Sequence, residues 1–163
     1  MIKRGNADAG LRLLRTALDE LRETGSALRY TAFLGVLAEG SAGAGRATEG
    51  LAAVDEALER SQANEERWCI AELLRIKGEL LLLEQAPDAA TAAEDHFQQA
   101  LDWARRQGAL SWELRAATNL ARMWCGQGRS KEARTLLGPV YDRFVEGFET
   151  ADLKAAKVLL SDL

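Results

Sequence analysis

The sequence contains few of the residues on which several common architectures and sites depend. Only two prolines, Pro87 and Pro139, occur in 163 residues, and no run alternates β-branched or aromatic residues with polar ones, so no strand is predicted. His96 is the single histidine, which excludes a metal centre built from several histidines, and we expect it to lie on the surface. The two cysteines, Cys69 and Cys125, form no Cys-x-x-Cys motif, and we expect buried free thiols in a reducing compartment.

Long apolar runs and an excess of positive charge are also missing. The longest apolar stretch, residues 80–83, is far too short to cross a bilayer. The formal net charge is −4, and acidic residues surround the local basic clusters, which excludes the basic stripe typical of nucleic-acid-binding proteins. No apolar run of the kind found in a secretory signal follows Met1. We therefore expect a cytoplasmic protein that binds neither nucleic acid nor a membrane.

The sequence does contain an internal repeat. One sign of the repeat is a pattern of three residues: a small residue, a large residue four positions later, and a small residue three positions after that. The pattern occurs four times, at separations of 40, 43 and 40 residues. The second sign is a small residue that directly follows a long or apolar one. It occurs at Ala38, Gly78 and Ala121, which are separated by 40 and 43 residues. Such periods are typical of stacked helical hairpins, whose helices cross closely only where side chains are small. The first pattern is carried by Gly10, Leu14 and Ala17, by Gly50, Val54 and Ala57, by Ala93, Phe97 and Ala100, and by Ala133, Leu137 and Val140.

The repeat predicts an all-α fold, an α-α superhelix of helical hairpins with a C-terminal capping helix. Glycines at 43, 45, 126 and 128 predict turns between paired helices. They do not predict a nucleotide loop, because no Gly-x-x-x-x-Gly-Lys-Ser/Thr motif is present. Thr150 is the predicted N-cap of the last helix, and Pro139 should kink or interrupt the seventh after Gly138. The predicted helices span residues 7–24, 27–43, 46–62, 65–84, 89–107, 110–125, 129–146 and 150–161. They form a single domain over 1–163, made of a half hairpin 7–24, hairpins 27–62, 65–107 and 110–146, and the cap helix 150–161.

The residues of the repeat resemble the tetratricopeptide repeat (TPR) family. The family pattern Trp-x-x-Leu-Gly-x-x-Tyr on a first helix is similar to Ala117-x-x-Leu120-Ala121-x-x-Trp124. Its pattern Ala-x-x-x-Phe-x-x-Ala on a second helix is similar to Ala133-x-x-x-Leu137-x-x-Val140. The family unit has about 34 residues, so the longer unit here needs longer helices. The resemblance implies a non-catalytic scaffold whose first helices line a groove for a protein or peptide partner.

Three stretches resemble the C-terminal TPR region of multidomain bacterial adenylate/guanylate cyclase–ATPase signalling proteins. The resemblance implies the sensor or scaffold tail of such a protein, and its partners would include other domains of the same chain. It carries over no catalytic residue, cofactor or metal, because the catalytic domains would lie upstream. The alternative is a ligand-sensing TPR tail of a bacterial transcription activator. The stretches are residues 66–81 with Glu66-Arg67-Trp68, residues 94–115 with Trp112-Glu113-Leu114-Arg115, and residues 141–160 with Glu146-Gly147-Phe148.

Polar residues on the predicted first helices form the candidate partner-binding groove. One interpretation is a charged groove that binds a peptide or another domain, with its arginines holding carboxylates. The other is a ladder of salt bridges between units, such as Glu72 with Arg115, that only solvates the surface. An open charged channel would favour a peptide, and an enclosed apolar pocket would favour a small ligand. Helical spacing puts Glu72, Arg75 and Glu79 on one face, and Arg115, Thr118 and Arg122 on the equivalent face of the next unit.

The helix predicted over residues 7–24 matches a second helix with no first helix before it. Its apolar face should therefore be exposed, and exposed faces of this kind mark interfaces. A second copy of the chain on this face, giving a homodimer, is one partner that the pattern predicts. The residues of this candidate interface are Leu11, Leu14, Leu18 and Leu21.

Overall fold

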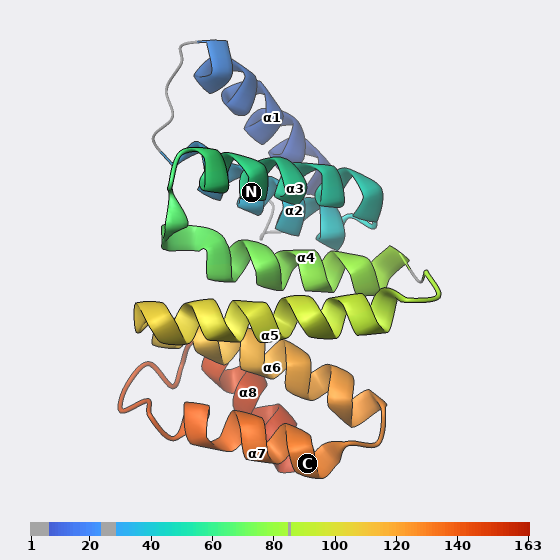
Figure 1. The fold of residues 1–163 in the computed structure, drawn as a ribbon, viewed down its shortest axis with the longest axis vertical. Helices are drawn as coiled ribbons and strands as arrows, with labels where there is room; N and C mark the ends of the chain where they lie inside the picture. The colour runs from blue at the N-terminus through green and yellow to red at the C-terminus, as the bar shows by residue number, and fades with distance from the viewer. Residues whose placement is uncertain (1–6, 24–28, 85) are drawn as a thin grey trace.

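The computed structural model describes residues 7–23, 29–84 and 86–163. Within these ranges all the regular structure is helical, which confirms the predicted all-α fold (Figure 1). The elements are α1 (Ala7–Glu23), α2 (Tyr30–Gly43), α3 (Ala47–Ala63), the 3₁₀ turn η2 (Arg67–Cys69), α4 (Ile70–Glu84), α5 (Ala89–Gln107), α6 (Leu110–Gly126), α7 (Ser130–Tyr141) and α8 (Ala151–Asp162).

Paired helices stack into an array. The chain forms the hairpins α2–α3, α4–α5 and α6–α7, and each second helix also packs against the first helix of the following hairpin. The first helices α2, α4 and α6 contact one another in order, and α8 packs beside α6 and α7. Figure 1 shows α1 at one end of the long axis, with α7 and α8 toward the other. The arrangement is an α-α superhelix that ends in a C-terminal capping helix, as the repeat predicts.

The repeated small residues lie where helices cross. A Cβ added to Gly78 would lie 2.6 Å from Cε1 of Phe97. A Cβ added to Gly50 would lie 2.5 Å from Cδ2 of Leu80 and 3.1 Å from the carbonyl oxygen of Ala38. Ordinary carbon–carbon contacts are about 3.5–4.0 Å, so these helices approach each other only because the small side chains leave room. The repeated small residues in the sequence therefore mark the places where the helices of a hairpin approach most closely, with a large side chain packed against each.

The glycine turns are as predicted, whereas two helix boundaries were predicted wrongly. Gly45 and Gly128 adopt the left-handed backbone, with φ of 71° and 76°, between paired helices. The helix predicted over residues 65–84 begins later, because Glu65 is left-handed and residues 67–69 form the 3₁₀ turn. The helix predicted over 129–146 ends at Tyr141, two residues after Pro139. A proline inside a helix removes one hydrogen bond and crowds the preceding turn.

Two further helix starts can be compared with their predictions. The start predicted at residue 27 lies outside the described residues, and α2 begins at Tyr30 after the left-handed Arg29. Thr150 takes the predicted N-cap position of α8 with an extended backbone, and its carbonyl accepts the Lys154 N–H at 3.1 Å. Its side chain makes no capping hydrogen bond.

Two clusters of buried apolar side chains meet at α4 and form the core. One cluster lies among α1 to α4 and includes Leu80, and the other lies among α4 to α8 and includes Phe97. Leu58 on α3 packs against both clusters. Both cysteines are free, as predicted, but only Cys69 is buried. The prediction of a buried thiol is wrong for Cys125, which lies half-buried near the exposed end of α6.

Candidate functional site: a charged hollow

A small hollow opens where the three first helices meet α8. We call it the charged hollow, and its volume is about 180 Å³. The repeat brings equivalent positions of α2, α4 and α6 to this surface, and Glu39, Glu79 and Arg122 share one such position. The α8 helix adds residues from outside the repeat. The lining residues are Glu39, Arg75, Glu79, Arg115, Thr118, Asn119, Arg122, Asp152 and Ala155.

Arg75 on α4 is a buried guanidinium at the base of the hollow. Its side chain is 3% exposed, and it donates two hydrogen bonds of 2.9 Å to the carboxylate of Glu72. A third contact joins its Nη1 to Oε2 of Glu79 at 2.7 Å, and its Nη2 donates to Oε1 of Glu39 at 3.2 Å. Burial alone would lower the pKa of Arg75, but Glu72 and then Glu79 raise it above its ordinary value. Arg75 therefore stays charged and bound to its carboxylates.

Arg115 on α6 extends this network across four helices. Its Nη2 donates to Glu39 on α2 at 2.6 Å, and its Nη1 pairs with Glu72 on α4. Its Nε lies 3.9 Å from Oδ1 of Asp152 on α8. The Glu72–Arg115 pair confirms that a salt-bridge ladder joins neighbouring units. The same pairs fix the positions of the charges in the hollow, since each carboxylate bridges two helices or two arginines.

Arg122 and Thr118 differ in how accessible their side chains are to a partner. Arg122 is exposed, and its Nη1 donates to Oδ1 of Asn119 at 3.4 Å. Thr118 is buried, and its hydroxyl donates to the carbonyl oxygen of Leu114 at 2.7 Å. The guanidinium of Arg122 is therefore the one in the hollow that is best placed to receive a carboxylate from outside.

The structure brings all six predicted groove residues together at the charged hollow, with Arg75 and Thr118 buried beneath it, but sequence reasoning missed others. Five of the six line the hollow, and Glu72 lies beside it, bound to two arginines. Asn119, which donates to Glu79 at 2.7 Å, was missed because its repeat position holds the apolar residues Val36 and Ile76. Asp152 was missed because α8 has no counterpart in the repeat, so no spacing argument places it.

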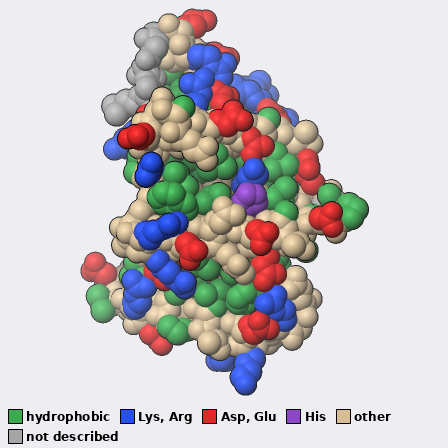
Figure 2. Space-filling model, viewed as in Figure 1, with side chains coloured by type: hydrophobic (Ala, Val, Ile, Leu, Met, Phe, Trp, Pro, Cys, Tyr) green, Lys and Arg blue, Asp and Glu red, His purple; other side chains and the backbone are tan. Residues whose placement is uncertain are grey.

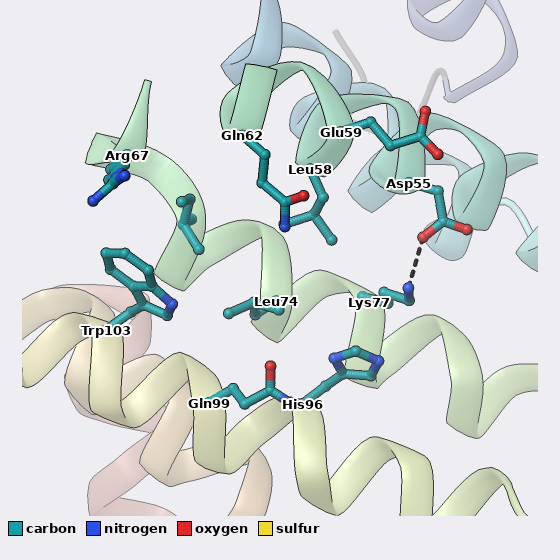
Figure 3. Close-up of a pocket in the computed structure, with 11 residues that line it drawn as sticks. Asp55, Leu58, Glu59, Gln62, Arg67, Leu74, Lys77, His96, Gln99 and Trp103 are labelled. Atoms are coloured by element: carbon teal, nitrogen blue, oxygen red, sulfur yellow. Dashed lines mark ion pairs between the residues drawn. The ribbon is translucent and has the colours of Figure 1, made fainter. Parts of the chain in front are cut away.

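A larger cleft lies between α3 and α5 over α4 (Figure 3), and we call it the second-helix cleft. Its volume is about 730 Å³. Leu58 and Leu74 supply apolar surface in its middle, and Nζ of Lys77 pairs with Oδ1 of Asp55 at 2.7 Å at one end. The lining residues are Asp55, Leu58, Glu59, Gln62, Arg67, Ile70, Leu74, Lys77, His96, Gln99 and Trp103.

His96 lies at the surface as expected, but it lines the second-helix cleft and is half-buried there. Its ring is half-buried between α5 and α4, and its Nδ1 is buried with no hydrogen-bond partner among the described residues. Figure 2 shows this histidine between two hydrophobic patches. Burial, and then the positive charge of Lys77, lower the pKa of His96 below its ordinary value. The imidazole is therefore neutral at pH 7.

An apolar surface at the start of the array is the third candidate, and we call it the N-terminal face. It surrounds a hollow of about 410 Å³ lined by Leu14, Ala17, Leu18, Glu20, Leu21 and Phe33. Leu11 and Leu18 are buried in the core between α1 and the helices that follow. The expectation that all four leucines are exposed is therefore wrong for these two, because α2 packs against α1 on that side. Leu14 and Leu21 are half-buried and form the open part of the face.

The described residues offer no metal site and no membrane-spanning helix, and the chain has no recognised relative. No group of three or more histidine, cysteine, aspartate or glutamate side chains suited to a metal ion occurs within residues 7–23, 29–84 and 86–163. None of the helices in these ranges combines the length and apolarity needed to cross a membrane. No model of a known protein family matches the chain, and no curated protein is significantly similar to it.

Proposed function

We propose that this chain is a non-catalytic protein-interaction scaffold that binds a segment of a partner protein at the charged hollow. The observation that carries the proposal is a cluster of charges from four helices, held in place by its own ion pairs, with Arg122 exposed at its edge. Groups that are already positioned lose little conformational freedom when a partner binds. The resemblance of the repeat to the TPR family supports the same kind of function.

The size of the charged hollow favours a protein segment over a small molecule. Pockets that enclose small ligands usually have volumes of about 300–1,000 Å³ and mostly apolar walls. The charged hollow has about 180 Å³ and is lined mainly by charged and polar side chains. A peptide can place single side chains in such a hollow while its backbone runs along the first helices.

The charges also suggest what the partner segment contains. The exposed guanidinium of Arg122 suits an acidic side chain, with which it can form two parallel hydrogen bonds. Asp152 is 53% exposed and lies 3.9 Å from Arg115, so its carboxylate remains open to a lysine or arginine. We therefore propose a segment that carries an acidic and a basic residue close together.

Peptide selection followed by matched variants tests this function. Peptides displayed as a library are selected on the immobilised chain, and their affinities are measured by fluorescence anisotropy for three variants. Arg122→Glu and Asp152→Lys should each weaken binding about tenfold at low salt, because they reverse charges at the site. Arg134→Glu, on the outer helix α7, should leave binding unchanged. Selected peptides that bind all three variants equally would show that the charged hollow is not the binding site.

A specific observation favours small-ligand sensing as a second candidate function. The second-helix cleft has a volume of about 730 Å³, which falls within the usual range of about 300–1,000 Å³ for ligand pockets. His96 lines the cleft, and its buried Nδ1 has no hydrogen-bond partner among the described residues. In a fragment screen by nuclear magnetic resonance, hits in this cleft should be lost on His96→Leu. Hits that survive this change would exclude the cleft as their site.

The wider setting of the scaffold is also a proposal. The resemblance of residues 66–81, 94–115 and 141–160 to bacterial signalling proteins supports a cytoplasmic signalling protein with nucleotide-cyclase and ATPase domains. The ligand-sensing tail of a transcription activator is the corresponding setting for the second candidate. Joining this chain to a cyclase domain and assaying cyclic-nucleotide synthesis with and without a selected peptide distinguishes a signalling tail from an inert one.

A further inference from the structure

A pair of tryptophans lies where α4 and α6 begin, one helical turn before the ion pair that joins these two helices. The ring centroids of Trp68 and Trp112 are 6.3 Å apart, with an angle of 34° between the ring planes. Trp112 precedes Arg115 by three residues on α6, and Trp68 precedes Glu72 by four, in the η2 turn that leads directly into α4. Residues three or four apart share one face of a helix. Because Arg115 pairs with Glu72, the tryptophan pair is continuous with the surface of the charged hollow.

The Trp68 side chain is exposed although the backbone that carries it is held in place. It is 46% exposed, whereas Trp112 is half-buried and packs against the cluster formed by α1 to α4. On one side of Trp68, the carbonyl oxygen of Arg67 accepts a hydrogen bond of 2.6 Å from the Gln107 side chain, and on the other side Cys69 is buried in the core. Tryptophan is enriched among the residues that carry most of the binding energy of protein interfaces. A side chain on a fixed backbone also loses little conformational freedom when a partner covers it.

We infer that the two tryptophans bind a large apolar side chain of the same partner segment that occupies the charged hollow, an inference that rests on the proposed function. A segment that runs along α6 past Arg122 and Arg115 reaches Trp112 next, since these residues share one face of the helix. The indole rings add apolar surface beside a hollow lined mainly by charged and polar side chains. An apolar side chain of the segment is stabilised when it leaves water at this surface. The tryptophan pair therefore distinguishes between segments that carry the same charges.

The geometry of α6 sets the spacing of residues in this segment. Trp112 and Arg122 are ten residues apart, which corresponds to about 15 Å along the helix axis. An extended segment advances about 3.3 Å per residue, so its apolar residue lies about four or five residues from the acidic residue bound by Arg122. Oδ1 of Asp152 lies 3.9 Å from Nε of Arg115, and Arg115 lies between Trp112 and Arg122 on the helix. The basic residue of the segment therefore falls between the apolar and the acidic one.

Two matched variants of the chain test the inference with the peptides selected for the charged hollow. Trp68→Ser should weaken their binding about tenfold in fluorescence anisotropy, because it removes the exposed aromatic ring. Leu83→Ser changes a side chain of similar exposure, 50%, near the other end of α4 and should leave binding unchanged. Replacing the apolar residue of the peptide by serine should weaken binding to the natural chain about tenfold but have little further effect on Trp68→Ser, because the contact is then already lost.

The emission of the tryptophans gives a second readout. A bound peptide should protect the emission of the natural chain from quenching by acrylamide, because it covers the exposed Trp68 ring. Protection should be smaller in Trp68→Phe, which keeps an aromatic ring and should still bind the peptide. Equal protection in the two proteins would overturn the inference. Circular dichroism checks that Trp68→Ser remains helical.

The outcomes separate this inference from the proposed function. Binding that falls on Arg122→Glu but not on Trp68→Ser would overturn the inference and leave the proposed function standing. Binding that is insensitive to Arg122→Glu would overturn both. In light scattering, a dimer of the natural chain that Trp68→Ser dissociates would overturn the inference as well, because a second copy would then cover the tryptophans.

Discussion

Replacing Arg75 by methionine tests how much the charge network contributes to the fold. The change Arg75→Met keeps most of the apolar stem of a side chain that is 3% exposed but removes the guanidinium. Three carboxylates, those of Glu39, Glu72 and Glu79, then lose a common positive partner. Their mutual repulsion and lost hydrogen bonds should destabilise the folded state.

The expected loss follows from the exposure of these carboxylates. Removing one member of a fully buried ion pair costs about 3–5 kcal/mol. Glu72 is 15% exposed, but Glu39 and Glu79 are 29% and 35% exposed and can be rehydrated. Arg115 also continues to neutralise Glu39 and Glu72. We therefore expect a loss of about 2–3 kcal/mol in the free energy of unfolding, at or below the lower end of that range.

Urea unfolding followed by far-ultraviolet circular dichroism measures this loss. The control Arg122→Met removes an exposed arginine of the same surface and should cost less than about 0.5 kcal/mol. Adding Glu72→Gln and Glu79→Gln to Arg75→Met should recover about 1 kcal/mol, because fewer unpaired charges then remain. A loss below about 1 kcal/mol for Arg75→Met, or a further loss on adding the glutamines, would refute the argument that the network stabilises the stack.

Three other predictions rest on single residues. Because burial lowers the pKa of His96 from 6.5, the unfolded chain binds that proton more readily, so the free energy of unfolding should fall as pH drops below 6.5. His96→Gln should flatten this fall in urea unfolding measured at several pH values, and an unchanged slope would contradict it. Burial raises the pKa of the Cys69 thiol, so a thiol reagent should label the half-buried Cys125 first, as mass spectrometry of digests can show. Gly78→Ala should lower the free energy of unfolding by about 1–3 kcal/mol through overpacking, whereas Gly43→Ala, whose added Cβ meets nothing within 4 Å, should not be destabilising.

The fold could be predicted because each hairpin repeats one steric requirement. Gly78 and Phe97 mark a helix crossing that the sequence shows two more times in modified form. The ends of the helices were harder to predict, because each end depends on the backbone conformation of a single residue. The left-handed Glu65 ends the preceding segment although nothing in the residue type requires it. A glutamate rarely takes that conformation, so the following helix was predicted to begin at residue 65, whereas α4 begins at Ile70.

The candidate site could be predicted only in part. Equal spacing along the first helices placed Arg75 and Arg115 on one surface, because helical periodicity and the repeat both apply there. The spacing could not predict that the Arg75 side chain is buried among its carboxylate partners, because that burial depends on how closely α2 and α6 approach α4. The second-helix cleft was not anticipated, because it arises between helices that are not neighbours in the chain.

The place where the two core clusters meet has a mechanical consequence. Leu58 and the two faces of α4 join the clusters, and the pairs that Arg75 and Arg115 make with Glu39 cross the same junction from α2 to α6. Bending the stack about α4 would strain these ion pairs together with the close approach of Gly35 on α2 to Leu73 on α4. Because the Arg75 side chain is only 3% exposed, added salt should weaken its pairs less than it weakens ion pairs at the exposed ends of the array.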